Sequence, residues 1–339
     1  MAGSGTATGS APAVRGGTAS RRGGVLVRIL IRLGVFLASL LVASLIIFWV
    51  CNALPGNVAQ AMLGQSADPA AVRALEEQLG LNRPFFVRYG EWIGGMLTGD
   101  MGTSYLTHQQ VGVQIAEKFG VTAWLVGFAM VLALLIAVPV GTFAALRRRH
   151  WAGFVTSGLS QLGLAIPAFW AGIMAVWLFG VWLRWFPANG YVPLTEDPAQ
   201  WLAHLVLPVC SLALVQSAVL VRYVRSATIE VLSEDYYRTA RAVGWREIPA
   251  LLRHGLRNAS LSVVTVLGLQ LTTLLVGAIV IEQVFALPGL GSLLLQAVAQ
   301  RDLVMVQGTV LVLVLAVLLV NFLVDLSYLL LDPRLRERR

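Results

Sequence analysis

The most regular feature of the chain is the alternation of long apolar segments with polar ones. Each apolar segment is nearly free of charge and long enough to cross roughly 30 Å of hydrocarbon at about 1.5 Å per residue. The segments cover about residues 25–50, 121–146, 154–183, 202–224, 261–285 and 304–331. The pattern predicts an all-α, multi-pass membrane protein with six transmembrane helices, kinked where Pro139, Pro167 and Pro208 fall inside them.

Composition supports this class of protein and excludes others. Only 12% of the residues are charged and 57% are hydrophobic, whereas an average soluble domain is about 25% charged. A soluble enzyme, a nucleic-acid-binding domain and a secreted disulfide scaffold are thereby excluded. Cys51 and Cys210 fit no metal-binding spacing and lie at or in apolar segments, so we interpret them as small membrane-embedded side chains.

The distribution of basic residues predicts the orientation in the membrane. Six helices put both termini on one side, and 19 of the 25 lysines and arginines then fall on that side. Because cytoplasmic loops carry the excess of basic residues, we expect both termini in the cytoplasm and the chain in the cell (inner or plasma) membrane. The net charge of +8 has the same topological explanation.

The polar segment at about 52–119, on the outer side, has the pattern of ordered helices. Asp68 followed by Pro69 is typical of a helix start, and a second, aromatic-rich helix is expected over about 84–99. The aromatic face of this second helix could lie on the membrane surface or on the bundle. The whole segment is either a plain outer cap or a platform on which a binding protein docks. The docking candidates are Tyr89, Trp92 and Asp100.

The polar segment at about 225–258, on the inner side, predicts two short helices. Ser233 is a good N-cap for the first, with Glu234 and Asp235 in its first turn, where acidic side chains are favourable. Gly244 can end this helix in the left-handed conformation. Two interpretations stay open at this point: a loop held on anionic lipid by its arginines, or an element that transmits force from a cytosolic partner.

The sequence lacks the motifs of a self-sufficient enzyme. It contains no Gly-x-x-x-x-Gly-Lys-Ser/Thr loop for ATP and no His-Glu-x-x-His zinc motif, so we expect no catalytic site, no metal site and no cofactor bound by this chain. Uncharged polar residues within the spans either line a route for a polar solute or form interhelical hydrogen bonds. The pathway candidates are Gln216, Thr265, Gln270 and Thr273. Glu282 and Asp325 lie near the ends of their spans, where capping or pairing is expected.

Several short motifs follow one another along the chain. The inner loop reads Glu234-Asp235-Tyr236-Tyr237-Arg238-Thr239-Ala240-Arg241-Ala242-Val243-Gly244, followed by Leu252-Arg253-His254-Gly255-Leu256-Arg257-Asn258-Ala259. The others are Leu54-Pro55-Gly56-Asn57, Leu79-Gly80-Leu81-Asn82-Arg83-Pro84, Gly99-Asp100-Met101-Gly102-Thr103-Ser104, Phe285-Ala286-Leu287-Pro288-Gly289-Leu290-Gly291, Arg301-Asp302 and Leu331-Asp332-Pro333-Arg334. Together, over about residues 25–336, they resemble the permease subunits of ATP-binding-cassette importers, in the dipeptide/oligopeptide/nickel branch.

The resemblance implies a MetI-like importer-permease bundle with an ordered extracytoplasmic loop and a cytoplasmic coupling helix. The coupling residues it implies are Glu234, Asp235, Arg238, Thr239, Ala240, Gly244 and Trp245. The Glu-Ala-Ala of the general importer motif is replaced here by Arg-Thr-Ala at 238–240, and its leucine after the glycine is Trp245. We divide the chain into a disordered tail (1–24), the first helix with the outer loop (25–117), a five-helix core (118–332) containing the coupling loop 233–257, and a basic tail (333–339).

The resemblance also implies partners. A second homologous permease would complete the pathway, two cytosolic ATPases would bind ATP and Mg, and an extracytoplasmic solute-binding (lipo)protein would deliver the cargo. The implied cargo is a di- or oligopeptide, with nickel or another small solute as the alternative. A self-sufficient secondary carrier is disfavoured because the middle of the spans lacks acidic residues, and a membrane-embedded enzyme because no nucleophile–base or metal set is evident.

Overall fold

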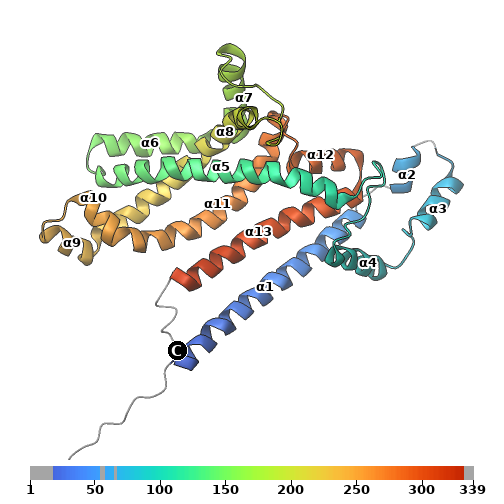
Figure 1. The fold of residues 1–339 in the computed structure, drawn as a ribbon, viewed down its shortest axis with the longest axis horizontal. Coiled ribbons are helices and arrows are strands. Elements are labelled where there is room, and N and C mark those ends of the chain that lie inside the picture. The colour runs from blue at the N-terminus through green and yellow to red at the C-terminus, as the bar shows by residue number, and fades with distance from the viewer. Residues whose placement is uncertain (1–17, 54–57, 65–66, 332–339) are drawn as a thin grey trace, which may run out of the picture.

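The computed structural model describes residues 18–53, 58–64 and 67–331, and these residues are mostly helical (Figure 1). The α-helices are α1 (Thr18–Ala53), α2 (Val58–Leu63), α3 (Pro69–Gln78), α4 (Phe85–Thr98), α5 (Val111–Leu146), α6 (Trp151–Ala165), α7 (Ala168–Ala175), α8 (Pro198–Ser233), α9 (Asp235–Ala242), α10 (Glu247–Ala250), α11 (Leu256–Val284), α12 (Leu290–Gln300) and α13 (Leu303–Leu331). Two π-helical segments, Val176–Trp182 and Leu251–Gly255, continue α7 and α10. The predicted motif at 54–57 and the tails 1–17 and 332–339 lie outside the described residues.

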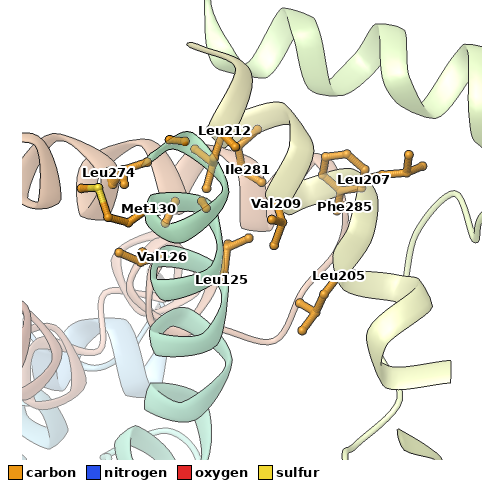
Figure 2. Packing of buried hydrophobic residues seen from close by; sticks show 14 of the residues in the cluster. Leu125, Val126, Met130, Leu205, Leu207, Val209, Leu212, Leu274, Ile281 and Phe285 are labelled. Carbon is orange, nitrogen blue, oxygen red and sulfur yellow. The ribbon is translucent and has the colours of Figure 1, made fainter. Parts of the chain in front are cut away.

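The centre of the bundle is the contact between α5 and α8, which α11 covers. Apolar side chains of these three helices, together with Phe285 just after α11, form one buried cluster, and Figure 2 shows its members around the helix contact. The labelled members are Leu125, Val126, Met130, Leu205, Leu207, Val209, Leu212, Leu274, Ile281 and Phe285. Pro139 and Pro208 both lie inside continuous helices, where neighbouring helices can compensate for the hydrogen bond that each proline cannot donate.

The described residues contain five helices that are long and apolar enough to span a membrane, or six spans if one bent pair is counted as a single span. That pair is α6 with α7 and its π-helical extension, which meet at an angle of 93°. The expectation of one continuous helix over 154–183 is therefore wrong. Pro167 ends α6 rather than kinking it, because proline disfavours the helical conformation of the residue before it, and Ile166 adopts φ −90° and ψ 118°.

Helices α1 and α13 lie side by side along much of their length (Figure 1). Near one end of this contact, Arg32 donates to the carboxylate of Asp325 at 2.6 Å, and the rings of Phe36 and Phe322 lie 5.5 Å apart. The expectation that Asp325 pairs is thus confirmed. Helix α1 begins at Thr18, so residues 18–24, predicted to lie in the disordered tail, are helical.

A buried carboxylate fixes the start of α12. The side chain of Glu282 is inaccessible to solvent; it accepts a hydrogen bond from the Thr122 hydroxyl at 2.6 Å and one from the Ser292 amide at 3.0 Å. Thr122 in turn accepts from the Leu290 amide at 2.9 Å. A carboxylate and a hydroxyl therefore satisfy amides that the first turn of any helix leaves unpaired. Gly289 is required beside them, because a Cβ atom there would lie 2.2 Å from the Glu282 carboxyl carbon.

A second polar contact joins the outer loop to the corner between α12 and α13. The Ser104 hydroxyl donates to the Asp302 carboxylate, and both side chains are buried. Asp302 also accepts from the Met305 amide at 3.3 Å, so it caps the first turn of α13. Ser104 accepts from the amides of Leu106 and Thr107, which orders the loop around it. The outer segment is thereby attached to the bundle at a defined point.

The hydrogen bonds of Thr122 predict that removing its hydroxyl destabilises the protein more than removing the hydroxyl of Thr309, another buried threonine. Thr122→Val keeps the side-chain volume but leaves the Leu290 amide and one Glu282 oxygen unpaired, and each buried group left unpaired costs about 1–3 kcal/mol. We expect a clear fall in the midpoint of thermal unfolding of the purified protein in detergent. Thr309→Val is the matched control, because the buried Thr309 hydroxyl has no hydrogen-bond partner among the described residues. Equal shifts in the two variants would refute the assigned role of Thr122.

Candidate functional site

The predicted coupling loop forms a compact unit at the end of α8. Helix α8 continues to Ser233, well beyond the predicted end of its span at residue 224, and α9 folds back against its last turns. A small buried cluster holds α8, α9, α10 and the segment after α10 together. Its members are Val231, Tyr237, Ala240, Ala250 and Leu251. Figure 1 shows α9 and α10 at one end of the bundle, with α2, α3 and α4 at the opposite end.

The start of α9 differs from the prediction by one residue. Ser233 is the last residue of α8, and its hydroxyl donates back to the Glu230 carbonyl at 2.7 Å, so it is not the N-cap of α9. Glu234 occupies the N-cap position with an extended backbone and makes no side-chain capping bond. The prediction failed because the buried face of α8 extends to Val231, and the helix therefore includes the serine as its last residue. Asp235 does lie in the first turn of α9, as predicted.

The coupling candidates divide into an exposed set and a packed set. Glu234, Asp235, Arg238 and Thr239 are exposed. Arg238 lies 3.6 Å from the Asp235 carboxylate in a solvent-exposed pair, which contributes little stability. Ala240 is buried against α8, whereas Trp245 is half-buried. The exposed set leaves both signs of charge accessible to a partner at the tip of the loop.

The turn after α9 has the hydrogen bonds of a Schellman motif. The Trp245 amide donates to the Ala240 carbonyl at 3.2 Å, and the Gly244 amide donates to the Arg241 carbonyl at 3.1 Å. Gly244 has φ +98°, which confirms the predicted left-handed cap. Glycine adopts this conformation without the steric penalty that a Cβ atom brings.

Side-chain contacts of Arg241 and Arg253 stabilise the same turn. The Arg241 guanidinium donates to the Trp245 carbonyl at 2.6 Å and lies 3.8 Å from the Glu247 carboxylate, while the Arg253 guanidinium lies 5.4 Å from the centre of the Trp245 ring. Burial raises the pKa of the Tyr237 phenol, the Glu247 carboxylate raises it further and Arg241 opposes the shift. Tyr237 therefore stays neutral near pH 7 and can remain packed in the loop.

Among the predicted pathway residues, the structure describes the side chains of Gln216, Gln270 and Thr273. Gln216 is buried in α8 and donates to the Gln270 side chain of α11 at 2.7 Å, which favours the interhelical interpretation for this pair. Thr273 is exposed and its hydroxyl donates to the Leu269 carbonyl of its own helix at 3.1 Å. Thr265 lies in α11, and its side chain is outside the part of the chain that is described.

The three docking candidates do not share an exposed surface. Tyr89 and Trp92 face α1: the Tyr89 hydroxyl is 2.8 Å from that of Ser44, and both rings lie 5.5 Å from the ring of Phe48. Of the two positions considered for the aromatic face, the structure therefore places it on the bundle. Asp100 is exposed and accepts from the Gly102 amide at 2.9 Å. Trp92 and Asp100 both line a cavity of about 410 Å³ between α1, the α3–α4 turn, α4 and the start of α13.

Sequence reasoning missed the groups that hold the outer segment in place. Ser104 and Asp302 appeared only as parts of motifs, and nothing in their spacing indicated that their side chains meet. Among the described residues, no three His, Cys, Asp or Glu side chains are grouped so that they could hold a metal ion.

The chain matches two family descriptions that together cover most of its length. Residues 137–337 match "Binding-protein-dependent transport system inner membrane component", and residues 25–126 match the N-terminal region of the same kind of component. A peptide transport system permease protein of Brucella abortus is 41% identical over 308 residues, which are 91% of this chain and 98% of that protein. A glutathione transport system permease protein of Salmonella choleraesuis is 38% identical over 310 residues, which are 91% of this chain and 99% of that protein.

A solved structure supports the fold independently. A chain from the inward-facing methionine ABC transporter MetNI superposes with a TM-score of 0.54 at 18% sequence identity, covering 64% of this chain and 96% of that chain. At this identity the likeness concerns the fold alone, and it confirms the predicted MetI-like bundle.

The Gln216–Gln270 contact predicts a measurable coupling between α8 and α11. Gln216→Leu, Gln270→Leu and the double variant form a thermodynamic cycle, with an expected coupling energy of about 0.6 kcal/mol and at most about 1.7 kcal/mol in a membrane protein. Thermal unfolding in detergent would supply the stabilities. Thr273→Val combined with Gln216→Leu is the control cycle, because the Thr273 hydroxyl bonds its own helix. Strict additivity in both cycles would mean that the glutamine contact has no energetic role.

Proposed function

Because the chain belongs to the family of binding-protein-dependent transport system inner membrane components, the permeases of ATP-binding-cassette importers, we propose that it forms half of a translocation pathway for di- and oligopeptides. The cargo class is supported by the relatives, which are named for the transport of peptides and of glutathione, itself a small peptide. The direct test is uptake of labelled di- and oligopeptides into vesicles that contain the assembled importer. Uptake of nickel with no uptake of peptides would reject the peptide cargo.

The loop formed by α9, the Gly244 turn and α10 is the element that we assign to coupling. The observation that carries this assignment is its combination of an exposed tip with a rigid base: Thr239 and Asp235 are accessible, while Ala240 and Tyr237 are packed on α8. A partner that pulls or pushes α9 therefore acts directly on α8 and, through α8, on α5. In this scheme the two ATPases bind ATP and Mg and contact the exposed residues, and this chain has no ATPase site of its own.

The remaining partners follow from the incomplete pathway. A single bundle offers one wall of a route, so a second homologous permease completes it. A solute-binding (lipo)protein delivers cargo at the side that carries α2, α3 and α4. Alternating access then occurs as rigid-body movement of the two permeases, driven by closure of the ATPases.

The orientation that we assign places both termini, the α5–α6 turn and α9 in the cytoplasm. The charge asymmetry supports it, and in Figure 1 the α5–α6 turn and α9 lie at the same end of the bundle. Helices α2, α3 and α4 are then extracytoplasmic.

The coupling assignment predicts that Gly244→Val uncouples the importer without preventing membrane insertion. Valine resists a left-handed backbone by roughly 1–2 kcal/mol, and this cost falls on the turn rather than on the bundle. We expect loss of peptide uptake, with reduced co-purification of the ATPases or loss of substrate-stimulated hydrolysis. Gly244→Asn is the control, because asparagine tolerates the same conformation and should retain most of the activity. Transport and hydrolysis at parental levels in Gly244→Val would leave the loop as a lipid-bound connector.

The orientation predicts the labelling of two exposed arginine positions. In a variant without Cys51 and Cys210, Arg73→Cys should react with an impermeant maleimide in intact cells, whereas Arg148→Cys should react only after the membrane is opened. The reverse pattern would invert the assigned topology. Equal labelling of both positions before the membrane is opened would show that the reagent had entered the cells. Release of a cytosolic marker protein into the medium monitors this leakage.

A further inference from the structure

Helix α4 is apolar over more than the face that it packs on the bundle. Its packed face consists of Phe85, Tyr89, Trp92 and Met96, at the spacing of one side of a helix. On the neighbouring stripe the side chains of Phe86 and Leu97 are 77% and 84% exposed. The helix thus leaves large apolar side chains uncovered in the described structure.

The uncovered stripe runs along one side of α4 without interruption by a charged side chain. Gly90 lies between Phe86 and Leu97 on this side of the helix, and a Cβ atom there would meet nothing within 4 Å. The polar residues of α4 lie on a separate stripe, where Glu91 pairs with Arg83 at 2.7 Å and Thr98 is exposed. A helix with apolar side chains on one face and charged side chains on another is typical of a helix lying in a membrane interface.

Contacts with the two candidate membrane spans α1 and α13 indicate how deep α4 lies relative to the membrane surface. Its packed face contacts Ser44 and Phe48 of α1, which precede the end of that span at Ala53 by about 8–14 Å at a rise of about 1.5 Å per residue. The second contact is with α13. The Met96 methyl group of α4 lies near Gly308 of α13, since a Cβ atom built at Gly308 would be 4.0 Å from it. Gly308 lies about 8 Å inside the span that begins at Leu303. Both contacts therefore indicate that α4 lies alongside the end turns of the two spans, toward the middle of the membrane, and not beyond their ends.

We propose that the exposed stripe of α4, formed by Phe86 and Leu97 on either side of Gly90, inserts among the acyl chains of the adjacent membrane leaflet. Membrane lipid is the occupant that fits, because α1, on which α4 packs, also exposes large apolar side chains, such as Ile46 and Trp49, within its membrane span. The Arg83–Glu91 pair then lies at the level of the lipid head groups, where charged side chains remain hydrated.

This position gives α4 a role distinct from docking. Its two apolar faces hold the outer segment between α1 and the lipid, so the segment is anchored on one side by protein and on the other by the membrane. The surface left for a soluble partner is the polar side, which faces the cavity lined by Arg88, Glu91 and Asp100.

The test uses spin labels on single cysteines in the full chain, assembled with its partner subunits in liposomes of phosphatidylethanolamine and phosphatidylglycerol. Phe86→Cys and Leu97→Cys report the apolar stripe, after replacement of Cys51 and Cys210. Collision rates with oxygen, which concentrates in the hydrocarbon, are compared with those of a water-soluble nickel chelate. We expect the ratio of oxygen to nickel collisions to be several-fold higher at 86 and 97 than at the control Thr98→Cys, which lies on the polar stripe of the same turn.

Each other outcome overturns the proposal. Ratios at 86 and 97 that equal the ratio at 98 would place the stripe in water. Low collision rates with both reagents would show that a partner subunit covers it. A water-exposed stripe that becomes protected when a purified solute-binding protein is added would assign it to protein docking instead.

Discussion

The hydrocarbon layer offers no hydrogen-bond partner, and this constraint determines how the polar side chains of the spans are arranged. Glu282 is buried only because Thr122 and the first amides of α12 surround its carboxylate. Asp325 pairs with Arg32, and Gln216 pairs with Gln270. The Glu282–Thr122, Arg32–Asp325 and Gln216–Gln270 contacts each join helices that are far apart in the sequence, whereas a short side chain such as Thr273 bonds a carbonyl of its own helix. The same few bonds that satisfy these groups therefore also fix which helices are neighbours.

Helix α8 connects the centre of the bundle to the loop that we assign to coupling. It is one continuous helix of 36 residues, or about 54 Å at about 1.5 Å per residue, and its buried face runs from Trp201 to Val231. The middle of this face packs on α5 and α11, and its last turns carry the buried cluster beneath α9. Because α9 is attached to the end of the central helix, a displacement at the exposed tip cannot be absorbed by a flexible linker. The Schellman turn at Gly244 then sets the direction in which the chain leaves α9.

The outer segment is ordered by a different balance. It is attached to the bundle by a small set of contacts: the ring cluster around Phe48, the Tyr89–Ser44 hydrogen bond and the Ser104–Asp302 contact. These contacts attach the segment to α1 and to the α12–α13 corner. They leave a polar cavity on one side and an apolar stripe on the other, so the segment presents two chemically different surfaces at the outer end of the bundle.

The sequence by itself determined the fold class, the spans except the third, the helix starting at Pro69, the left-handed Gly244 and the family, because these depend on local periodicity, on cap residues and on motifs read in order. The tertiary structure alone decided that Pro167 breaks its helix, that Ser233 belongs to α8, that Tyr89 and Trp92 face α1, and that Ser104 meets Asp302. A proline is compatible both with the continuous helix at Pro208 and with the break at Pro167, so its presence in the sequence does not by itself decide the outcome. The aromatic face of α4 likewise indicates from the sequence that something apolar covers it. Whether lipid or protein covers it depends on which other helices lie beside it in the tertiary structure.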